Sequence, residues 1–192
     1  MRTPLLAAGA LFATGCATAG VEEPAYTSVM AEDSFEVRAY EPMILAETVV
    51  DGEAVDSRMD GFSPLADYIF AKGRDGDKIA MTAPVTQEKS SDGWIVGFTM
   101  PAGYNMQTLP QPVDKDVKLV ERPGRKMAVV SYSGFAGEDR MREKERELMA
   151  RVQTAGLEPV GEVVHAFYDP PWTLPFMRRN EVMIEVRGST SR

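Results

Sequence analysis

The side chains with the strongest intrinsic chemistry are scarce in this 192-residue chain, which holds one cysteine, Cys16, and one histidine, His165. A single cysteine cannot form an internal disulfide, and no cysteine–histidine cluster has the spacing of a zinc site. Nucleophilic catalysis needs a nucleophile beside its base, and these two residues support neither a Ser–His–Asp nor a Cys–His arrangement. Carboxylates are plentiful, but nothing in the sequence places two of them in one cleft. The residues therefore favour a binding protein over an enzyme.

The one cysteine stands where a lipid could be attached. Residues 1–15 begin with a single positive charge, continue with an apolar run and end in small residues, which is typical of a secretory signal peptide. Residues 13–16 (ATGC) resemble a bacterial lipobox, although Ala13 stands where that pattern prefers Leu. The resemblance implies a lipid on Cys16, a flexible tether over 16–33 and a periplasm-facing place on a membrane of the bacterial cell envelope. The alternatives are a plain signal peptide with an incidental cysteine, or a buried N-terminal strand.

The overall composition indicates one soluble domain with an acidic surface. Apolar residues make up 44% and charged residues 26% of the chain, close to the averages for globular proteins. The formal net charge of −8 argues against nucleic acid, because phosphate binding requires clustered lysine and arginine. The same charge argues against electrostatic adhesion to anionic lipid.

The spacing of apolar residues changes between the period of a strand and that of a helix, and the same order occurs twice. The first half predicts strands at 35–40 and 43–50, a helix at 56–71, and strands at 78–87 and 94–100. The second half predicts strands at 117–121 and 126–132, a helix at 137–155, and strands at 162–168 and 181–187. Pro64 either opens the main run of the first helix behind Ser63 or kinks it.

This plan predicts an α+β fold, a pseudo-twofold repeat of two strand-strand-helix-strand-strand units joined at 109–112. Each unit has one apolar sheet face and one apolar helix face, so neither is expected to be stable alone. Together they predict a curved antiparallel sheet or barrel of about eight strands with two helices packed outside. The expected domain runs from 34 to 188, and 189–192 is expected to be a disordered tail.

Several stretches resemble the SOUL haem-binding family: residues 35–42 (FEVRAYEP), 78–85 (KIAMTAPV), 168–172 (YDPPW) and 178–182 (RRNEV). Their order and spacing hold from about 35 to 186, most of the expected mature chain. The resemblance implies a pseudo-symmetric α+β barrel with affinity for haem or a related tetrapyrrole, in some members without any iron ligand from the protein.

The resemblance also implies an apolar slot for the tetrapyrrole, formed by the first helix and the loop after the YDPP segment. Carried over by position, the slot takes the following residues from the helix and then the loop: Met59, Phe62, Ala66 and Ile69, and Trp172, Leu174 and Phe176. Residues at helical spacing equally often face their own core, whereas the loop residues lie among prolines and are expected to be exposed. Some members carry a basic residue where this chain has Met59, which counts against haem specifically.

Three more residues have two interpretations each. His165 is the only imidazole that could coordinate a haem iron, but a lone histidine in a strand, opposite in facing to Val164 and Ala166, is more often packed or on the surface. Arg178 and Arg179 could bind a ligand carboxylate, or could set the turn and pair within the protein.

The function that follows is a membrane-anchored carrier, buffer or scavenger of haem or another tetrapyrrole in the cell envelope. One rival is a sensor module whose barrel binds other amphipathic small molecules, which rests on fold analogy. The other is an enzyme acting on tetrapyrroles. The sequence leaves protein partners open.

Overall fold

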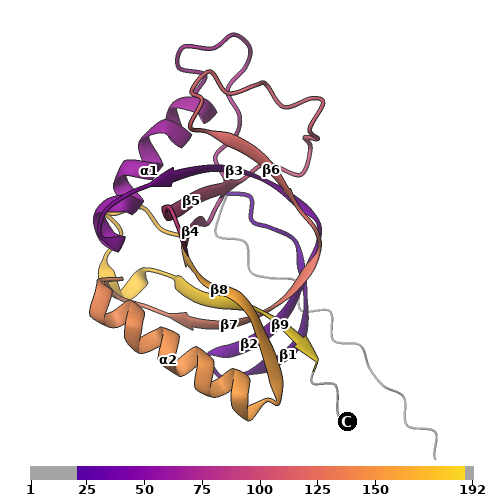
Figure 1. Cartoon of the computed structure of the whole chain (residues 1–192), viewed down its shortest axis with the longest axis vertical. Helices are drawn as coiled ribbons and strands as arrows, with labels where there is room; N and C mark the ends of the chain where they lie inside the picture. Colours follow the sequence, from indigo (N-terminus) through magenta and orange to yellow (C-terminus); the bar gives the residue numbers. More distant parts are fainter. Residues whose placement is uncertain (1–20, 189–192) are drawn as a thin grey trace, which may run out of the picture.

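Nine strands form one antiparallel sheet in residues 21–188, the part of the chain that the computed structural model describes (Figure 1). The strands are β1 (Tyr26–Glu32), β2 (Phe35–Tyr40), β3 (Met43–Val50), β4 (Val85–Ser90), β5 (Gly93–Thr99), β6 (Lys118–Arg122), β7 (Arg125–Tyr132), β8 (Leu157–Phe167) and β9 (Asn180–Gly188). The helices are α1 (Ala54–Ile69), α2 (Glu138–Thr154) and the short 3-10 helix η1 (Pro175–Met177). The predicted α+β class is confirmed.

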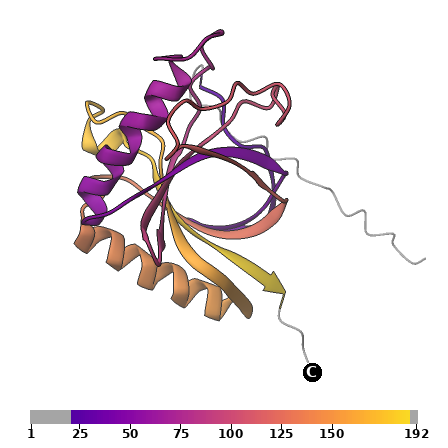
Figure 2. The same cartoon turned by 45° about the horizontal axis from the view of Figure 1, so that its top comes forward.

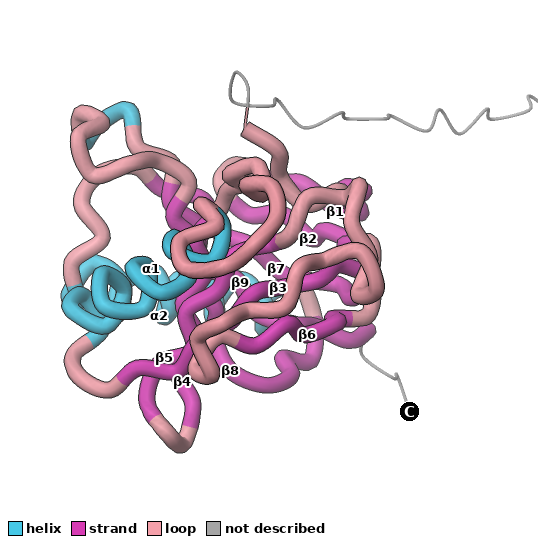
Figure 3. Tube along the Cα trace, turned by 90° about the horizontal axis from the view of Figure 1, so that it is seen from above, coloured by secondary structure: helices cyan, strands magenta, loops and turns pink. Residues whose placement is uncertain are grey.

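The sheet curls into a barrel, and both long helices lie outside it (Figures 1 and 2). Helix α1 packs on β3 and β5, and α2 packs on β7, β8 and β9. Seen from above, both helices lie on the same side of the strands (Figure 3). The predicted arrangement of a curved antiparallel sheet with two outer helices is therefore confirmed.

The two halves exchange their first strands. The order across the sheet is β1-β2-β7-β9-β8-β4-β5-β3-β6. Strand β2, from the first half, pairs with β7 of the second, with Phe35 opposite Val130. Strand β6, from the second half, pairs with β3 of the first, with Leu45 opposite Val120. Neither half thus completes its own part of the sheet, which is consistent with the expectation that neither is stable alone.

The alternation of side chains along each strand separates an outer core from the barrel interior. Under α2, Leu148 and Val152 pack on outward-facing strand residues that include Val37, Val130 and Val182. Under α1, Leu65 and Ile69 pack on a similar set that includes Ala46, Val96 and Phe98. A third cluster, of Met127, Val129, Val164, Ala166 and Met183, belongs to the opposite, inner faces of the strands.

Helix α1 sits very close to the sheet at Gly61. A Cβ atom at this position would lie 2.6 Å from the Cβ of Val96 on β5, so only glycine permits the contact. Pro64 lies inside the helix, which begins ten residues earlier at Ala54. Pro64 therefore does not open the helix, and Glu53 occupies the N-cap position.

Two boundaries differ from the sequence prediction. The expected tether reached residue 33, but residues 26–32 form β1 along β2, which makes nine strands instead of about eight. The expected strand 78–87 enters the sheet only at Val85. The residues before it bond elsewhere: the Ile79 amide donates to the Ile69 carbonyl and the Ala83 amide to that of Glu22.

Residues 1–20 and 189–192 fall outside the described part of the chain, and with them the predicted signal peptide, the lipid site at Cys16 and the C-terminal tail. Among residues 21–188, no helix is both long enough and apolar enough to cross a membrane.

Candidate functional site

The segment between β8 and β9, residues 169–178, is a proline-rich loop fastened to the domain at several points; we call it the tryptophan loop. The Arg178 guanidinium donates hydrogen bonds to the carbonyls of Thr173, at 2.8 Å, and Pro171. The Gly134 amide donates to the Pro175 carbonyl at 2.9 Å, which joins the loop to residues 133–137. The backbone of the tryptophan loop is therefore held in place.

The side chains of this fastened loop point into solvent. Trp172 is 82% exposed and Phe176 73%, and Leu174 and Met177 are also exposed. Phe135, from the neighbouring segment 133–137, is exposed as well, and the Arg178 guanidinium lies 4.9 Å from the centre of its ring. The exposure predicted for Trp172, Leu174 and Phe176 is confirmed.

Helix α1 passes beside the tryptophan loop (Figures 1 and 2) and contributes one exposed residue of the predicted set. Met59 is 61% exposed. We call these side chains together the apolar surface: Met59, Phe135, Trp172, Leu174, Phe176 and Met177. Scattered exposed apolar residues are ordinary, but this many large ones in two adjoining loops and a helix mark a surface that meets a ligand or partner.

The other helix residues of the predicted slot lie in the core instead. Ile69 is fully buried, Ala66 is buried, and Phe62 is half-buried with its ring 5.4 Å from that of Phe98. The resemblance implied a ligand face for these residues, but their helical spacing seats α1 on β3 and β5. In this structure these three residues lie behind the apolar surface, and only Met59 lies on it.

A guanidinium that the sequence analysis missed lies between α1 and the second half. Arg58 donates a hydrogen bond to the Ala136 carbonyl at 3.2 Å, and its guanidinium carbon lies 3.8 Å from the centre of the Phe167 ring. No carboxylate in residues 21–188 forms an ion pair with it, and burial lowers the pKa of its side chain. Arginine nevertheless stays protonated, so Arg58 is a cation without a carboxylate partner, bonded to the segment that carries Phe135.

His165 is placed where it cannot reach the apolar surface. Its side chain is 1% exposed beneath α2, and its Nε2 lies 2.8 Å from the Glu145 carboxylate. It faces away from Val164 and Ala166, as the alternation predicts, and those two residues lie in the inner cluster. The candidate iron ligand is thus a buried residue in this conformation.

Arg178 and Arg179 have internal partners, which supports their structural interpretation. Arg178 holds the tryptophan loop as described above. The Arg179 guanidinium lies 2.6 Å from the Glu23 carboxylate and 3.5 Å from the centre of the Tyr168 ring. Asn180 also bonds within the protein, because its side-chain amide donates to the Gly134 carbonyl at 3.0 Å.

The inside of the barrel is charged and densely paired. Arg38 and Glu181 are buried and joined by two hydrogen bonds of 2.9 and 3.1 Å. The Tyr168 hydroxyl donates to Glu181 at 2.7 Å. Burial and then the neighbouring Glu181 charge hold the pKa of Tyr168 well above 10, so this hydroxyl keeps its proton. Burial likewise raises the pKa of Tyr40 to about 12.

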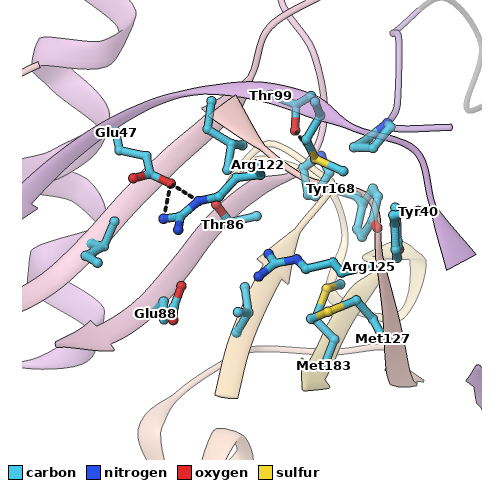
Figure 4. Close-up of a pocket in the computed structure, with 16 residues that line it drawn as sticks. Tyr40, Glu47, Thr86, Glu88, Thr99, Arg122, Arg125, Met127, Tyr168 and Met183 are labelled. Atoms are coloured by element: carbon cyan, nitrogen blue, oxygen red, sulfur yellow. Dashed lines mark hydrogen bonds and ion pairs between the residues drawn. The ribbon is translucent and has the colours of Figure 1, made fainter. Parts of the chain in front are cut away.

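Next to this network lies a small inner cavity, of about 50 Å³, with both charged and apolar walls (Figure 4). Arg122 is bound there by Glu47 at 2.7 Å. Glu88 also faces the cavity, and burial raises the pKa of its carboxyl group. Within the described residues, no group of histidine, cysteine, aspartate and glutamate could hold a metal ion.

Comparison with known proteins identifies a family. The sequence model described as "SOUL heme-binding protein" matches residues 21–185. Heme-binding protein 2 of Homo sapiens is 29% identical to this chain over 160 residues, 79% of this chain and 77% of that protein. Heme-binding protein 1 of Mus musculus is also 29% identical over 160 residues, 79% of this chain and 83% of that protein.

Solved structures with the same architecture are more distant in sequence. The C-terminal domain of EcmrR superimposes with a TM-score of 0.60 at 13% identity, over 85% of this chain and 98% of that one. A hydrolase from Listeria innocua superimposes with a TM-score of 0.53 at 14% identity, over 83% and 94% of the two chains. At such identities the likeness shows a shared fold and nothing about activity.

Proposed function

The chain belongs to the SOUL heme-binding protein family, and we propose that it binds haem or a related tetrapyrrole on the apolar surface. Two of its relatives are named heme-binding proteins. The proposed role is binding and not catalysis: a carrier, buffer or scavenger of the tetrapyrrole.

The observation that carries this proposal is the exposure of Trp172 and Phe176 on a loop whose backbone is fastened. A flat macrocycle offers two broad apolar faces, and aromatic rings and thioethers pack well against them. Because the loop is already held by Arg178 and Gly134, little conformational freedom would be lost when a ligand covers it.

The unpaired guanidinium of Arg58 supports a ligand that carries carboxylates. The propionates of a tetrapyrrole are such groups, and an arginine can bind a carboxylate with two parallel hydrogen bonds. Arg58 stands one position before Met59, which occupies the place where some family members have a basic residue. In this chain the cation therefore comes from the preceding residue of α1.

The residues present suit a haem that is held by its ring and propionates. When bound, haem would supply its iron and its ring absorption, while the chain's own residues hold the macrocycle and its carboxylates. His165 is the only histidine and is buried against Glu145, so the proposal does not route iron coordination through it.

Titration of the purified protein with haemin, followed by the Soret band, tests the proposal. We expect saturable one-to-one binding, and an unchanged Soret spectrum in a His165→Gln variant. No spectral change on titration would contradict the proposal, and metal loss or peroxide turnover above that of free haem would favour an enzyme.

The role of Arg58 is tested separately with Arg58→Gln. We expect it to weaken haemin binding about tenfold, the effect of losing one charge-assisted hydrogen bond of roughly 1.4 kcal/mol. The dimethyl ester of haemin lacks free carboxylates, so its affinity should be the same for both proteins. An equal loss for acid and ester would mean that Arg58 acts by supporting the loop.

We further propose that the domain is anchored to a membrane of the bacterial cell envelope by a lipid on Cys16, facing the periplasm. The support is the lipobox-like segment 13–16 and the start of the folded domain shortly after it, with β1 at Tyr26. Metabolic labelling with palmitate should mark the wild-type protein and not a Cys16→Ser variant. Label retained in that variant would refute the anchor.

A further inference from the structure

A cavity much larger than the inner cavity lies away from the apolar surface. It is an outer crevice of about 960 Å³ at the end of the barrel, between residues 22–25, the β2–β3 and β6–β7 turns and residues 99–105. Pro24, Met43, Thr99 and Arg122 line both this crevice and the inner cavity, so the two cavities are neighbours. Pockets for small molecules typically measure about 300 to 1,000 Å³.

The charge of this crevice is strongly negative. Four glutamates line it, Glu22, Glu23, Glu41 and Glu121, against one arginine, Arg122. The arginine is already paired with Glu47 at 2.7 Å. Glu22 accepts a hydrogen bond from the Ala102 amide and Glu23 is paired with Arg179.

The other two carboxylates have no partner among the described residues. Glu41 and Glu121 are exposed, and neither side chain makes a hydrogen bond or an ion pair with any residue from 21 to 188. They lie on the β2–β3 turn and at the end of β6, so the negative rim comes from both halves of the protein. Carboxylates in a concave site concentrate the electric field and attract cations.

The crevice itself also has apolar walls, formed by Pro42, Met43, Ile44, Met100, Pro101 and Tyr104. The neighbouring inner cavity has methionine and aliphatic side chains beside its charged ones, and Figure 4 shows Met127 and Met183 side by side on its wall. The apolar set is Met43, Leu45, Ile95, Met127, Val164 and Met183. Methionine side chains adapt to ligands of irregular shape, because they are flexible and polarizable.

The wall formed by residues 22–25 is fixed to both sides of the opening. The Glu22 carbonyl accepts from the Ala83 amide at 2.9 Å, and the Ala25 carbonyl accepts from the Glu41 amide at 3.1 Å. The Ala102 amide and Arg179 hold the two carboxylates of the same wall, as described above. The crevice is therefore formed in advance and not assembled by its ligand.

From this geometry we propose that the outer crevice binds a second ligand, a cationic amphipathic small molecule. Its apolar body lies against the Met43, Met100 and Tyr104 side of the crevice, and its amine or quaternary ammonium lies near Glu41 and Glu121. Haem does not suit this place, because its propionates would meet carboxylates. The site is therefore distinct from the apolar surface, and it does not depend on haem binding.

Two dyes with the same fluorophore and opposite charge test the proposal. Dansylcadaverine carries a primary ammonium and dansylglycine a carboxylate, and dansyl emission rises and shifts to shorter wavelength in an apolar site. In titrations of the purified protein we expect saturable binding of dansylcadaverine, at least tenfold tighter than that of dansylglycine. Equal affinity for the two dyes, or no binding of dansylcadaverine, would overturn the proposal.

Substitutions on the rim locate the site. The double variant Glu41→Gln/Glu121→Gln should weaken dansylcadaverine binding about fivefold to tenfold, as expected for removing two charges near the ligand in a wet site. The matched control Glu53→Gln/Glu158→Gln removes two exposed glutamates outside the crevice and should change the affinity less than twofold. Equal effects of the two double variants would refute the assigned position.

A blocking variant and a competition separate this site from the haem surface. Ala102 is exposed and lines the crevice, so Ala102→Trp should fill part of it and weaken dansylcadaverine binding while haemin titration stays unchanged. Haemin in excess should not displace the dye. Displacement by haemin, together with loss of dye binding in a Trp172→Ala/Phe176→Ala variant, would place the dye on the apolar surface and overturn the proposal.

Discussion

The apolar surface outside the barrel and the charged network inside it differ in burial and in whether their side chains have partners within the protein. Inside, Arg38 and Glu181 are buried and each meets several partners. Outside, Trp172 and Phe176 project into solvent and Arg58 has no carboxylate partner. A buried charge without partners would be very costly, so the interior must be satisfied for the protein to fold. Outside the barrel, side chains can remain without partners in the protein, and those side chains are available to a ligand.

This contrast implies that substitutions inside should change stability, and substitutions outside should change binding. The predictions below test that separation, starting with the largest effect.

Replacing Arg38 with methionine should be the most damaging single change. It leaves the buried Glu181 carboxylate with only the hydroxyls of Tyr168 and Ser131 as donors. The expected loss is about 3 kcal/mol or more of unfolding free energy, measured by urea denaturation. Arg142→Met, which removes two exposed ion pairs on α2, is the control and should cost less than about 1 kcal/mol. Equal losses for both variants would show that the buried ion pair contributes no more to stability than the exposed ones.

The double variant Trp172→Ala/Phe176→Ala should affect binding instead. Losing two aromatic faces should weaken haemin binding about 100-fold, from roughly 1 to 1.5 kcal/mol for each ring. The unfolding free energy should change by less than about 0.5 kcal/mol, because both side chains are largely exposed. Val113→Ala, at an exposed apolar residue elsewhere, is the control for binding. A large loss of stability with intact haemin affinity would mean that these two side chains stabilise the fold and do not bind the ligand.

The smallest predicted effect is the dependence of stability on pH that comes from His165, the buried residue beneath α2. Burial lowers the pKa of this imidazole below its ordinary value of 6.5, against an opposing effect of Glu145. As the pH falls below about 6.5, the unfolded chain takes up a proton that the folded protein does not, so stability falls with pH. The contribution cannot exceed about 1.4 kcal/mol per pH unit.

A His165→Gln variant should lack that component. Its unfolding free energy should therefore fall less steeply than that of the wild type between pH 7 and pH 5, measured by urea denaturation at each pH. Parallel curves for the two proteins would mean that His165 does not contribute to the pH dependence.

The repeat and most of its elements could be predicted from the sequence, because alternating and helical spacings are local signals that burial of one face requires. Strand β1 could not. Its residues are largely exposed, so its segment carries no alternating apolar pattern, and it becomes a strand through pairing with β2. The tether predicted over residues 16–33 was therefore too long, because it included β1.

The candidate site was predicted only in part, for a related reason. Prolines around Trp172 indicated exposure, and that prediction is confirmed. The resemblance assigned Ala66 and Ile69 to the slot by position, and their helical spacing could not show that this side of α1 packs on the sheet, where both are buried. Arg58 and Phe135 were missed because α1 approaches segment 133–137 only in the folded protein, where Arg58 bonds to Ala136, 78 positions away in the chain.

The exchange of β2 and β6 between the halves has a consequence for the integrity of the molecule. A protease that cut the chain between β5 and β6 would yield an N-terminal piece ending after β5 and a C-terminal piece beginning before β6. Each piece would still hold the other through the β2–β7 and β3–β6 ladders. The nicked protein should stay together as a complex of two fragments, because covalent continuity at that connection is not what joins them.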